Sequence, residues 1–170
     1  TSIKIYGTTS DGIYLYAAAE DGVYRAALND PFIVNSSNWQ EIYSPLPGSG
    51  PFNLISAIGN KIVVNHDLPG NDSLLYFSNN TWSGFVQFDV KYSLKTIGNE
   101  LIASSTFGVL FFDANMSLTS FVTVNEIPKL SCYDAIKDNS GVLWIADNVQ
   151  GMIKYQQPNQ YEFIFPNGPK

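Results

Sequence analysis

The sequence is short of the residues on which most catalytic centres and disulfide-stapled folds depend. It contains one cysteine, Cys132, and one histidine, His66. A single cysteine excludes an intrachain disulfide, and a single histidine excludes a metal centre built from several imidazoles. A Ser-His-Asp triad would have to use His66, and the chain has no Gly-x-Ser-x-Gly nucleophile elbow. The sequence therefore predicts no catalytic, metal-binding or cofactor-binding residue, and Cys132 is expected to be a small buried side chain.

Charge is also scarce, and most of it is negative. Charged residues make up 14% of the chain, and 15 Asp+Glu against 9 Lys+Arg give a net charge of -6. This balance argues against a nucleic-acid partner, which would require a basic surface. No apolar run approaches the roughly 18 residues of a membrane-spanning helix. Few charges combined with many aromatic residues indicate a folded globular chain rather than a disordered one.

What the sequence does contain is a repeat marked by glycines. Pairs of glycines ten residues apart recur at multiples of 43 residues, with an alanine five residues before the second glycine of each pair. The pairs are Gly12 and Gly22, Gly98 and Gly108, and Gly141 and Gly151, and the alanines are Ala17, Ala103 and Ala146. A period of this length is typical of β-propeller blades or helical arrays. Short runs of Ile, Val, Tyr and Phe, without long segments of helical period, favour strands.

The repeat predicts an all-β fold: a β-propeller segment of four four-stranded antiparallel blades, expected to be part of a larger propeller. The blades are expected at about residues 1–50, 51–90, 91–130 and 131–170, within a single propeller segment spanning residues 1–170. The first strand is expected at Ile3–Gly7, and Trp39 and Trp82 are expected to begin the last strands of the first two blades. The loop at Pro45–Pro51 is interpreted as a connection between blades.

The fourth unit carries a recognisable motif. Asp138 is followed by Gly141, by the run Leu143-Trp144-Ile145-Ala146-Asp147, and then by Gly151. This pattern resembles the two-component-regulator propeller repeat, in the variant found in PorZ-like propellers of type IX secretion in Bacteroidota. Asp138, Gly141, Trp144 and Gly151 are interpreted as structural: Asp138 accepts backbone N–H bonds across a turn, Gly141 supplies a positive φ, and Trp144 is expected to be buried between blades.

The resemblance implies a non-enzymatic recognition module in the periplasm or at the cell surface of a Gram-negative bacterium. Its implied partners are proteins of an envelope complex or a surface polysaccharide. The periplasmic glycan-sensing propeller of a hybrid two-component histidine kinase is the alternative, and an enzyme of the lyase or glycosidase kind is a third. Open blade faces would also allow self-association.

Ligand contacts are expected on the loops that lie together on one face of a propeller. These loops join the two middle strands of each blade and connect consecutive blades. They are rich in Asn, Asp and Gln, whose planar groups hydrogen-bond sugar hydroxyls, although ordinary solvated loops have the same composition. The candidates are Asp21, His66, Phe107, Asp147, Asn148 and Gln150. For His66 the favoured interpretation is a polar residue of a hairpin loop, with a ligand contact as the alternative.

Overall fold

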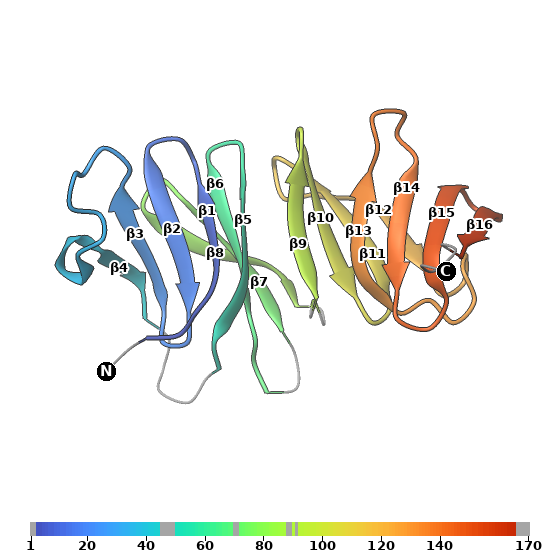
Figure 1. Cartoon of the computed structure of the whole chain (residues 1–170), viewed down its shortest axis with the longest axis horizontal. Helices are drawn as coiled ribbons and strands as arrows, with labels where there is room; N and C mark the ends of the chain where they lie inside the picture. The colour runs from blue at the N-terminus through green and yellow to red at the C-terminus, as the bar shows by residue number, and fades with distance from the viewer. Residues whose placement is uncertain (1–2, 45–49, 70–71, 88–89, 91, 166–170) are drawn as a thin grey trace, which may run out of the picture. The chain divides into compact units, whose positions relative to one another are not determined.

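The protein consists almost entirely of antiparallel β-sheet (Figure 1). The structure, a computed structural model, describes residues 3–44, 50–69, 72–87, 90 and 92–165. Four four-stranded sheets follow one another along the chain, and in each sheet the strands pair in chain order. Residues 45–49 of the loop expected between the first two blades lie outside the described residues. No described helix is long and apolar enough to span a membrane.

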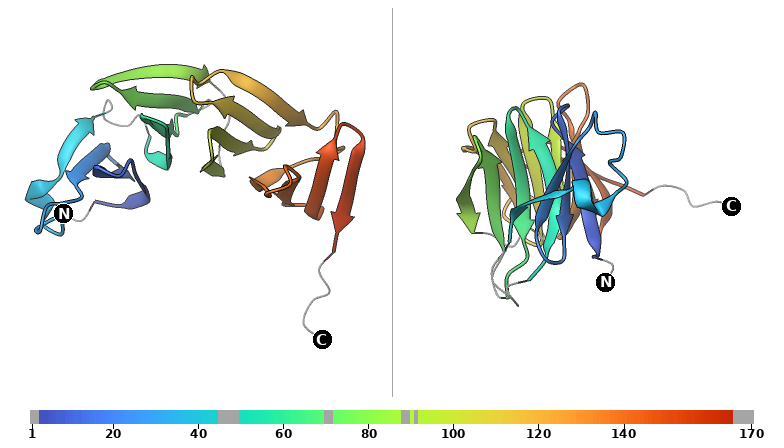
Figure 2. Two further views of the ribbon diagram at one scale, coloured as in Figure 1. Left: turned by 90° about the horizontal axis from the view of Figure 1, so that it is seen from above. Right: turned by 90° about the vertical axis from the view of Figure 1, so that its left-hand side faces the viewer.

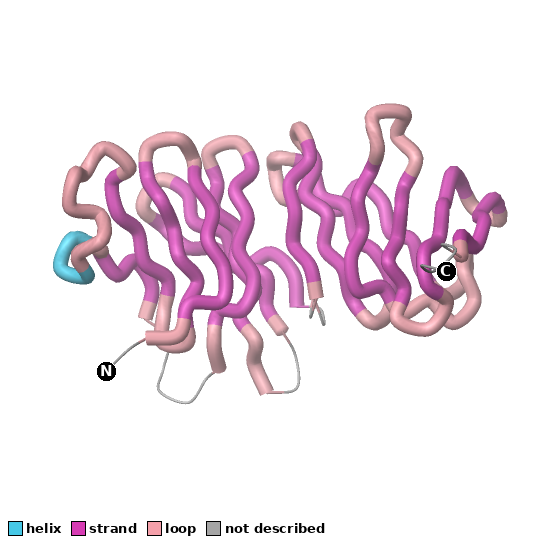
Figure 3. The backbone as a smooth tube through the Cα atoms, viewed as in Figure 1, coloured by secondary structure: helices cyan, strands magenta, loops and turns pink. Residues whose placement is uncertain are grey.

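The chain forms two compact units, residues 1–88 and 89–170. The first unit contains the sheet β1 (Ile5–Ser10), β2 (Tyr14–Ala19), β3 (Val23–Ala27) and β4 (Gln40–Tyr43), and the sheet β5 (Phe52–Ile58), β6 (Lys61–His66), β7 (Ser73–Ser78) and β8 (Thr81–Gln87). The single described helix is one 3-10 turn, η1 (Ser36–Asn38), in the connection from β3 to β4 (Figure 3).

The second unit contains two sheets of the same design. The third sheet consists of β9 (Ser93–Ile97), β10 (Glu100–Ser105), β11 (Gly108–Asp113) and β12 (Leu118–Thr123), and the fourth of β13 (Cys132–Lys137), β14 (Leu143–Asp147), β15 (Gly151–Gln157) and β16 (Gln160–Ile164). Four-stranded antiparallel sheets repeated in this way are the blades of a β-propeller, so the predicted fold class is confirmed.

Within each unit the two sheets pack through their first strands. β1 and β2 lie against β5 in the first unit, and β13 lies against β9 and β10 in the second (Figure 2). Alternate residues of each strand enter the core between the sheets. The core of the first unit includes Tyr16, Val23, Phe52 and Val64. The core of the second includes Phe111, Cys132, Ile145 and Ile153, which confirms the expected burial of Cys132.

The turn at Asp138 forms as the motif predicts. Its Oδ1 accepts hydrogen bonds from the backbone nitrogens of Ser140 (2.8 Å) and Val142 (3.0 Å). Gly141 has a φ of 81°, which lies in the left-handed region that favours glycine. Asp11 does the same in the first sheet, where its Oδ1 accepts from the nitrogens of Ile13 and Tyr14. An Asp at this position therefore closes the first hairpin of two sheets.

Two expectations are wrong. Trp144 is only half-buried, whereas its neighbours Leu143 and Ile145 are buried. Side chains alternate along β14, and the core between the third and fourth sheets takes the side opposite to Trp144. The first strand also begins later and extends further than Ile3–Gly7, because the pairing of β1 (Ile5–Ser10) with β2 continues as far as Ser10 opposite Leu15.

Candidate functional site

One edge of the second unit brings together most of the predicted ligand residues. The pairing of Ser93 with Ser104 places the start of β9 beside the end of β10, and the pairing of Cys132 with Asp147 places the start of β13 beside the end of β14. The turns β10–β11 and β14–β15 follow at this edge, together with the connection from β12 to β13. Phe107, Asp147, Asn148 and Gln150 all lie there.

Asp147 stabilises this edge rather than presenting a free carboxylate. It is buried, and its Oδ1 accepts hydrogen bonds from the backbone nitrogens of Val149 (2.8 Å) and Gln150 (2.7 Å). Its Oδ2 accepts from the nitrogen of Ser131 at 2.5 Å, and the nitrogen of Asn148 donates to the carbonyl of Ser131 at 2.9 Å. The carboxylate therefore joins the β14–β15 turn to the connection that precedes β13, and its lone pairs are occupied by backbone donors.

The other three residues of this edge differ in how accessible they are. Asn148 is exposed, and Phe107 is 55% exposed in the β10–β11 turn, where its backbone nitrogen donates to Ser105 Oγ. Gln150 is half-buried, and its Nε2 atom is buried without a hydrogen-bond partner. Phe107 and Asn148 are therefore the predicted residues best placed to meet a ligand.

Asp21 and His66 belong to the first unit and do not form a site by themselves. Asp21 is exposed in the β2–β3 turn. The pKa of Tyr24 is raised to about 12, mainly because the side chain is partly buried and further because Asp21 accepts its hydrogen bond and is negatively charged. Among the described residues, no group of three His, Cys, Asp or Glu side chains is arranged to hold a metal ion.

His66 is not the loop residue that the sequence suggested. It is the last residue of β6, it is buried, and its ring stacks on Phe52 at a centroid distance of 4.4 Å. The ring of Tyr43 lies 6.5 Å from it. Burial lowers the pKa of the imidazole, although the hydrogen bond with the Gly50 backbone and the charge of Asp67 oppose this shift. His66 is therefore a neutral part of an aromatic cluster at neutral pH.

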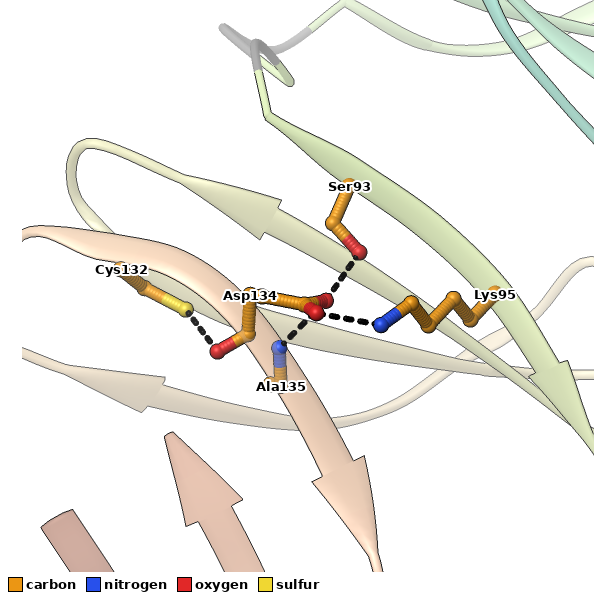
Figure 4. A network of polar contacts seen from close by, with 5 residues as sticks. All are labelled: Ser93, Lys95, Cys132, Asp134 and Ala135. Atoms are coloured by element: carbon orange, nitrogen blue, oxygen red, sulfur yellow. Dashed lines mark hydrogen bonds and ion pairs between the residues drawn. The ribbon is translucent and has the colours of Figure 1, made fainter. Parts of the chain in front are cut away.

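A polar network between β9 and β13 was not predicted from the sequence (Figure 4). Asp134 accepts hydrogen bonds from Ser93 Oγ at 2.6 Å and from Lys95 Nζ, and its Oδ1 also accepts from the nitrogen of Ala135. Burial alone would raise the pKa of this carboxyl, but the bonds and charge of Lys95 and the bond from Ser93 outweigh it and lower the pKa. Only the packing of the two sheets brings these residues together, since 39 positions separate Lys95 from Asp134.

An aromatic pair lies next to this network. Tyr92 precedes Ser93, Tyr133 precedes Asp134, and the two rings stack at a centroid distance of 4.3 Å with an interplanar angle of 20°. Tyr133 remains 47% exposed. An exposed aromatic ring beside a cation and a carboxylate is a suitable surface for a sugar, because the ring packs on C–H groups while the polar groups bond hydroxyls. We call Tyr92, Tyr133, Lys95 and Asp134 the tyrosine platform.

The fold and this edge define a β-propeller segment with polar and aromatic side chains gathered at one edge of its second unit. Comparison with solved structures agrees on the fold. The extracellular domain of the one-component system BT4673 from B. thetaiotaomicron superposes with a TM-score of 0.69 at 12% identity, over 95% of this chain and 22% of that one. A luciferin-regenerating enzyme superposes with a TM-score of 0.64 at 15% identity, over 94% of this chain and 61% of that one.

PorZ from Porphyromonas gingivalis, a surface component of the type IX secretion system, is a more distant structural match. Its TM-score is 0.49 at 14% identity, over 96% of this chain and 26% of that one. No protein-family model matches the sequence, and no curated protein is significantly similar to it. The chain spans about a fifth of the length of the BT4673 domain, and at these identities the likeness establishes the fold alone.

Proposed function

We propose that this protein is a non-enzymatic recognition module of a bacterial envelope protein, and that the tyrosine platform binds a surface polysaccharide. The observation that carries the proposal is the half-exposed side chain of Tyr133, which is stacked on Tyr92 and precedes Asp134, the carboxylate partner of Lys95. Stacking holds the ring of Tyr133 in place before a ligand arrives, which reduces the entropy lost on binding.

The polar groups of the platform suit a sugar that carries both hydroxyl and acidic groups. Lys95 offers a cation, and the side chains of Lys95 and Asp134 are 42% and 43% exposed, so both remain accessible to a ligand. Phe107 and Asn148, at the same edge, would extend the surface by an aromatic ring and an amide. The structural likeness to the extracellular domain of BT4673 supports a place outside the cytoplasm, in the periplasm or at the cell surface.

A sensory role is the second candidate. The likeness to BT4673 favours the glycan-sensing propeller of a two-component system, because a solved BT4673 structure is named as the extracellular domain of a hybrid two-component system. A secretion attachment complex of the PorZ kind is the other assembly that the motif around Asp138 suggests. The two roles share the binding surface and differ in what is attached to the propeller.

The test is a binding titration of the purified protein with soluble polysaccharides. Chondroitin sulfate serves as the acidic probe and dextran as the neutral one. We expect Tyr133→Ala to weaken binding of the acidic probe by roughly tenfold, since a contact made by an aromatic ring is worth about 0.5–1.5 kcal/mol. Tyr6→Ala is the matched control, because Tyr6 is 37% exposed with a lysine over its ring but lies in the first unit.

Three results would contradict the proposal. The first is an equal loss of binding in Tyr6→Ala and Tyr133→Ala, and the second is no binding of either probe. The third is the release of new reducing ends from the acidic probe, which would show that the protein is a glycosidase or lyase. A shared loss of binding by Tyr133→Ala and Phe107→Ala would indicate that the surface extends along the whole edge.

A further inference from the structure

A cavity of about 380 Å³ lies between the two sheets of the second unit. Residues of β11 and β12 line it from the third sheet, residues of β13, β14 and β15 line it from the fourth, and the β12–β13 connection contributes Glu126. All of the lining residues belong to the second unit, so the two packed sheets form the cavity by themselves. It includes no residue of the tyrosine platform and none of the ligand residues expected from the sequence.

Glu126 gives this cavity a carboxylate. Its Oε2 accepts a hydrogen bond from the hydroxyl of Tyr155, which is 7% exposed. Burial, followed by this hydrogen bond and the charge of Glu126, raises the pKa of Tyr155, so the hydroxyl remains a donor at neutral pH. Glu126 itself is half-buried and forms no ion pair with a cation among the residues that the structure describes. The carboxylate is therefore held by a neutral donor, and its negative charge is not balanced.

Among the described lining residues the one cation is Lys137, and it already has a partner. Its ammonium forms an ion pair with Glu100 at 2.5 Å and lies 4.2 Å from the centre of the Phe111 ring. Because Glu100 balances Lys137, the charge of Glu126 is left over. A cation that enters the cavity would supply the missing partner.

At the corresponding place in the first unit, the chain supplies a cation of its own. The glycine repeat that relates the first sheet to the third also aligns Arg25 with Phe111. The guanidinium of Arg25 lies 4.8 Å from the ring centre of Tyr14 and 5.8 Å from that of Phe77, in the next sheet. An arginine that lies on aromatic rings therefore occupies this place between the first two sheets.

The ring that corresponds to Phe77 in the second unit is Tyr155. Phe77 pairs with Trp82 across β7 and β8, and Tyr155 pairs with Tyr161 at the same place across β15 and β16. Both rings enter the core between their sheets. Among the described residues, however, no cation lies over the ring of Tyr155. The second unit thus keeps the aromatic rings, adds the carboxylate of Glu126 and has a phenylalanine in place of the arginine.

We propose that this cavity binds an amino sugar, with Glu126 as the counter-ion of its ammonium group. A carboxylate binds an ammonium group through charge-assisted hydrogen bonds, and the ring of Tyr155 offers a π face to the same cation. Gln156 and Gln157 line the cavity and are exposed, and their amides can hydrogen-bond hydroxyl groups. A cation that carries hydroxyl groups uses all of these side chains, whereas a plain amine would leave the amides without a role.

The experiment is a calorimetric titration of the purified protein with glucosamine at a pH of about 6, where an amine of this kind is protonated. N-acetylglucosamine, which has the same ring without the charge, is the neutral probe, and putrescine is an amine without hydroxyl groups. We expect glucosamine to bind, and each of the other two probes to bind roughly tenfold more weakly or not at all, because each lacks one set of polar contacts.

Two variants and a matched control locate the binding. Glu126→Gln keeps an acceptor for Tyr155 and removes the charge, so it should weaken glucosamine binding roughly tenfold. Gln156→Lys places an ammonium group in the cavity and should weaken the binding by a similar factor, which gives a second reading should Glu126→Gln fold poorly. Glu162→Gln removes an exposed carboxylate of β16 that does not line the cavity, and it should bind like the wild type.

The cavity and the tyrosine platform are tested separately, since they share no residue. Tyr133→Ala should bind glucosamine like the wild type, and Glu126→Gln should bind chondroitin sulfate like the wild type. Loss of glucosamine binding in Tyr133→Ala would overturn the proposal, because it would place the sugar on the platform. No binding of glucosamine, equal binding of N-acetylglucosamine or putrescine, or an equal loss in Glu126→Gln and Glu162→Gln would also overturn it.

Discussion

The indole nitrogen of Trp82, in β8, donates a 2.9 Å hydrogen bond to the carbonyl of Ile42, in β4 of the preceding sheet. The same ring packs on Tyr43 at a centroid distance of 5.1 Å. Both contacts join the outer strands of two successive sheets, far from the inner strands through which those sheets mainly pack. Trp82 therefore connects β8 to β4, the outermost strands of the two sheets of the first unit.

The bond itself can be tested by Trp82→Phe, which keeps an aromatic ring and removes the donor. We expect a loss of about 1 kcal/mol in the free energy of unfolding, because the half-buried Ile42 carbonyl loses its partner. Urea denaturation followed by circular dichroism measures it. Tyr76→Phe, which alters a ring on the same sheet, is the control and should change stability less. An unchanged midpoint in Trp82→Phe would show that water replaces the bond without cost.

The half-exposure of Trp144 predicts a modest effect of truncation. Trp144→Ala should cost about 1 kcal/mol in the monomer, whereas Ile145→Ala, at a fully buried neighbour, should cost about 2–5 kcal/mol. The comparison is made by urea denaturation at low protein concentration, so that association contributes nothing. A larger loss in Trp144→Ala than in Ile145→Ala would show that the indole is buried after all.

His66 predicts a specific pH dependence of stability. Its pKa is lower in the folded state than in the unfolded state, where it is about 6.5. Below about pH 6.5 the unfolded chain therefore binds more protons than the folded chain. The contribution of His66 to stability is fully present above this pH, and it is lost as the pH falls toward the folded pKa. Since His66 is the only histidine, His66→Gln should flatten the curve in this window. Unfolding free energies measured between pH 7 and 5 test this, and an unchanged slope in the variant would contradict it.

Cys132 should be unreactive in the folded protein. Burial, together with the charges of Asp134 and Asp147, raises the pKa of its thiol to about 12, so almost none of it is thiolate at neutral pH. We expect modification by a thiol reagent such as DTNB to be slow under native conditions and fast in concentrated urea. Fast modification of the native protein would show that the start of β13 opens readily.

How much the sequence determined can be seen in particular residues. The glycine and alanine recurrence predicted four sheets because each unit repeats the same turns, and a turn depends on its own few residues. Asp138 and Gly141 form the predicted turn for that reason.

What the tertiary structure decided is which side of each strand is covered. The Leu143-Trp144-Ile145 run is apolar on both sides of β14, so the sequence could not show that Trp144 is left half-exposed. The tyrosine platform likewise joins Tyr92 and Lys95 to Tyr133 and Asp134 across two sheets, and His66 is enclosed by Tyr43 and Phe52. These groupings arise from packing between strands about 40 residues apart or at the ends of different strands. A repeat pattern identifies the sheets, but it carries no information on how the side chains of one sheet meet those of the next.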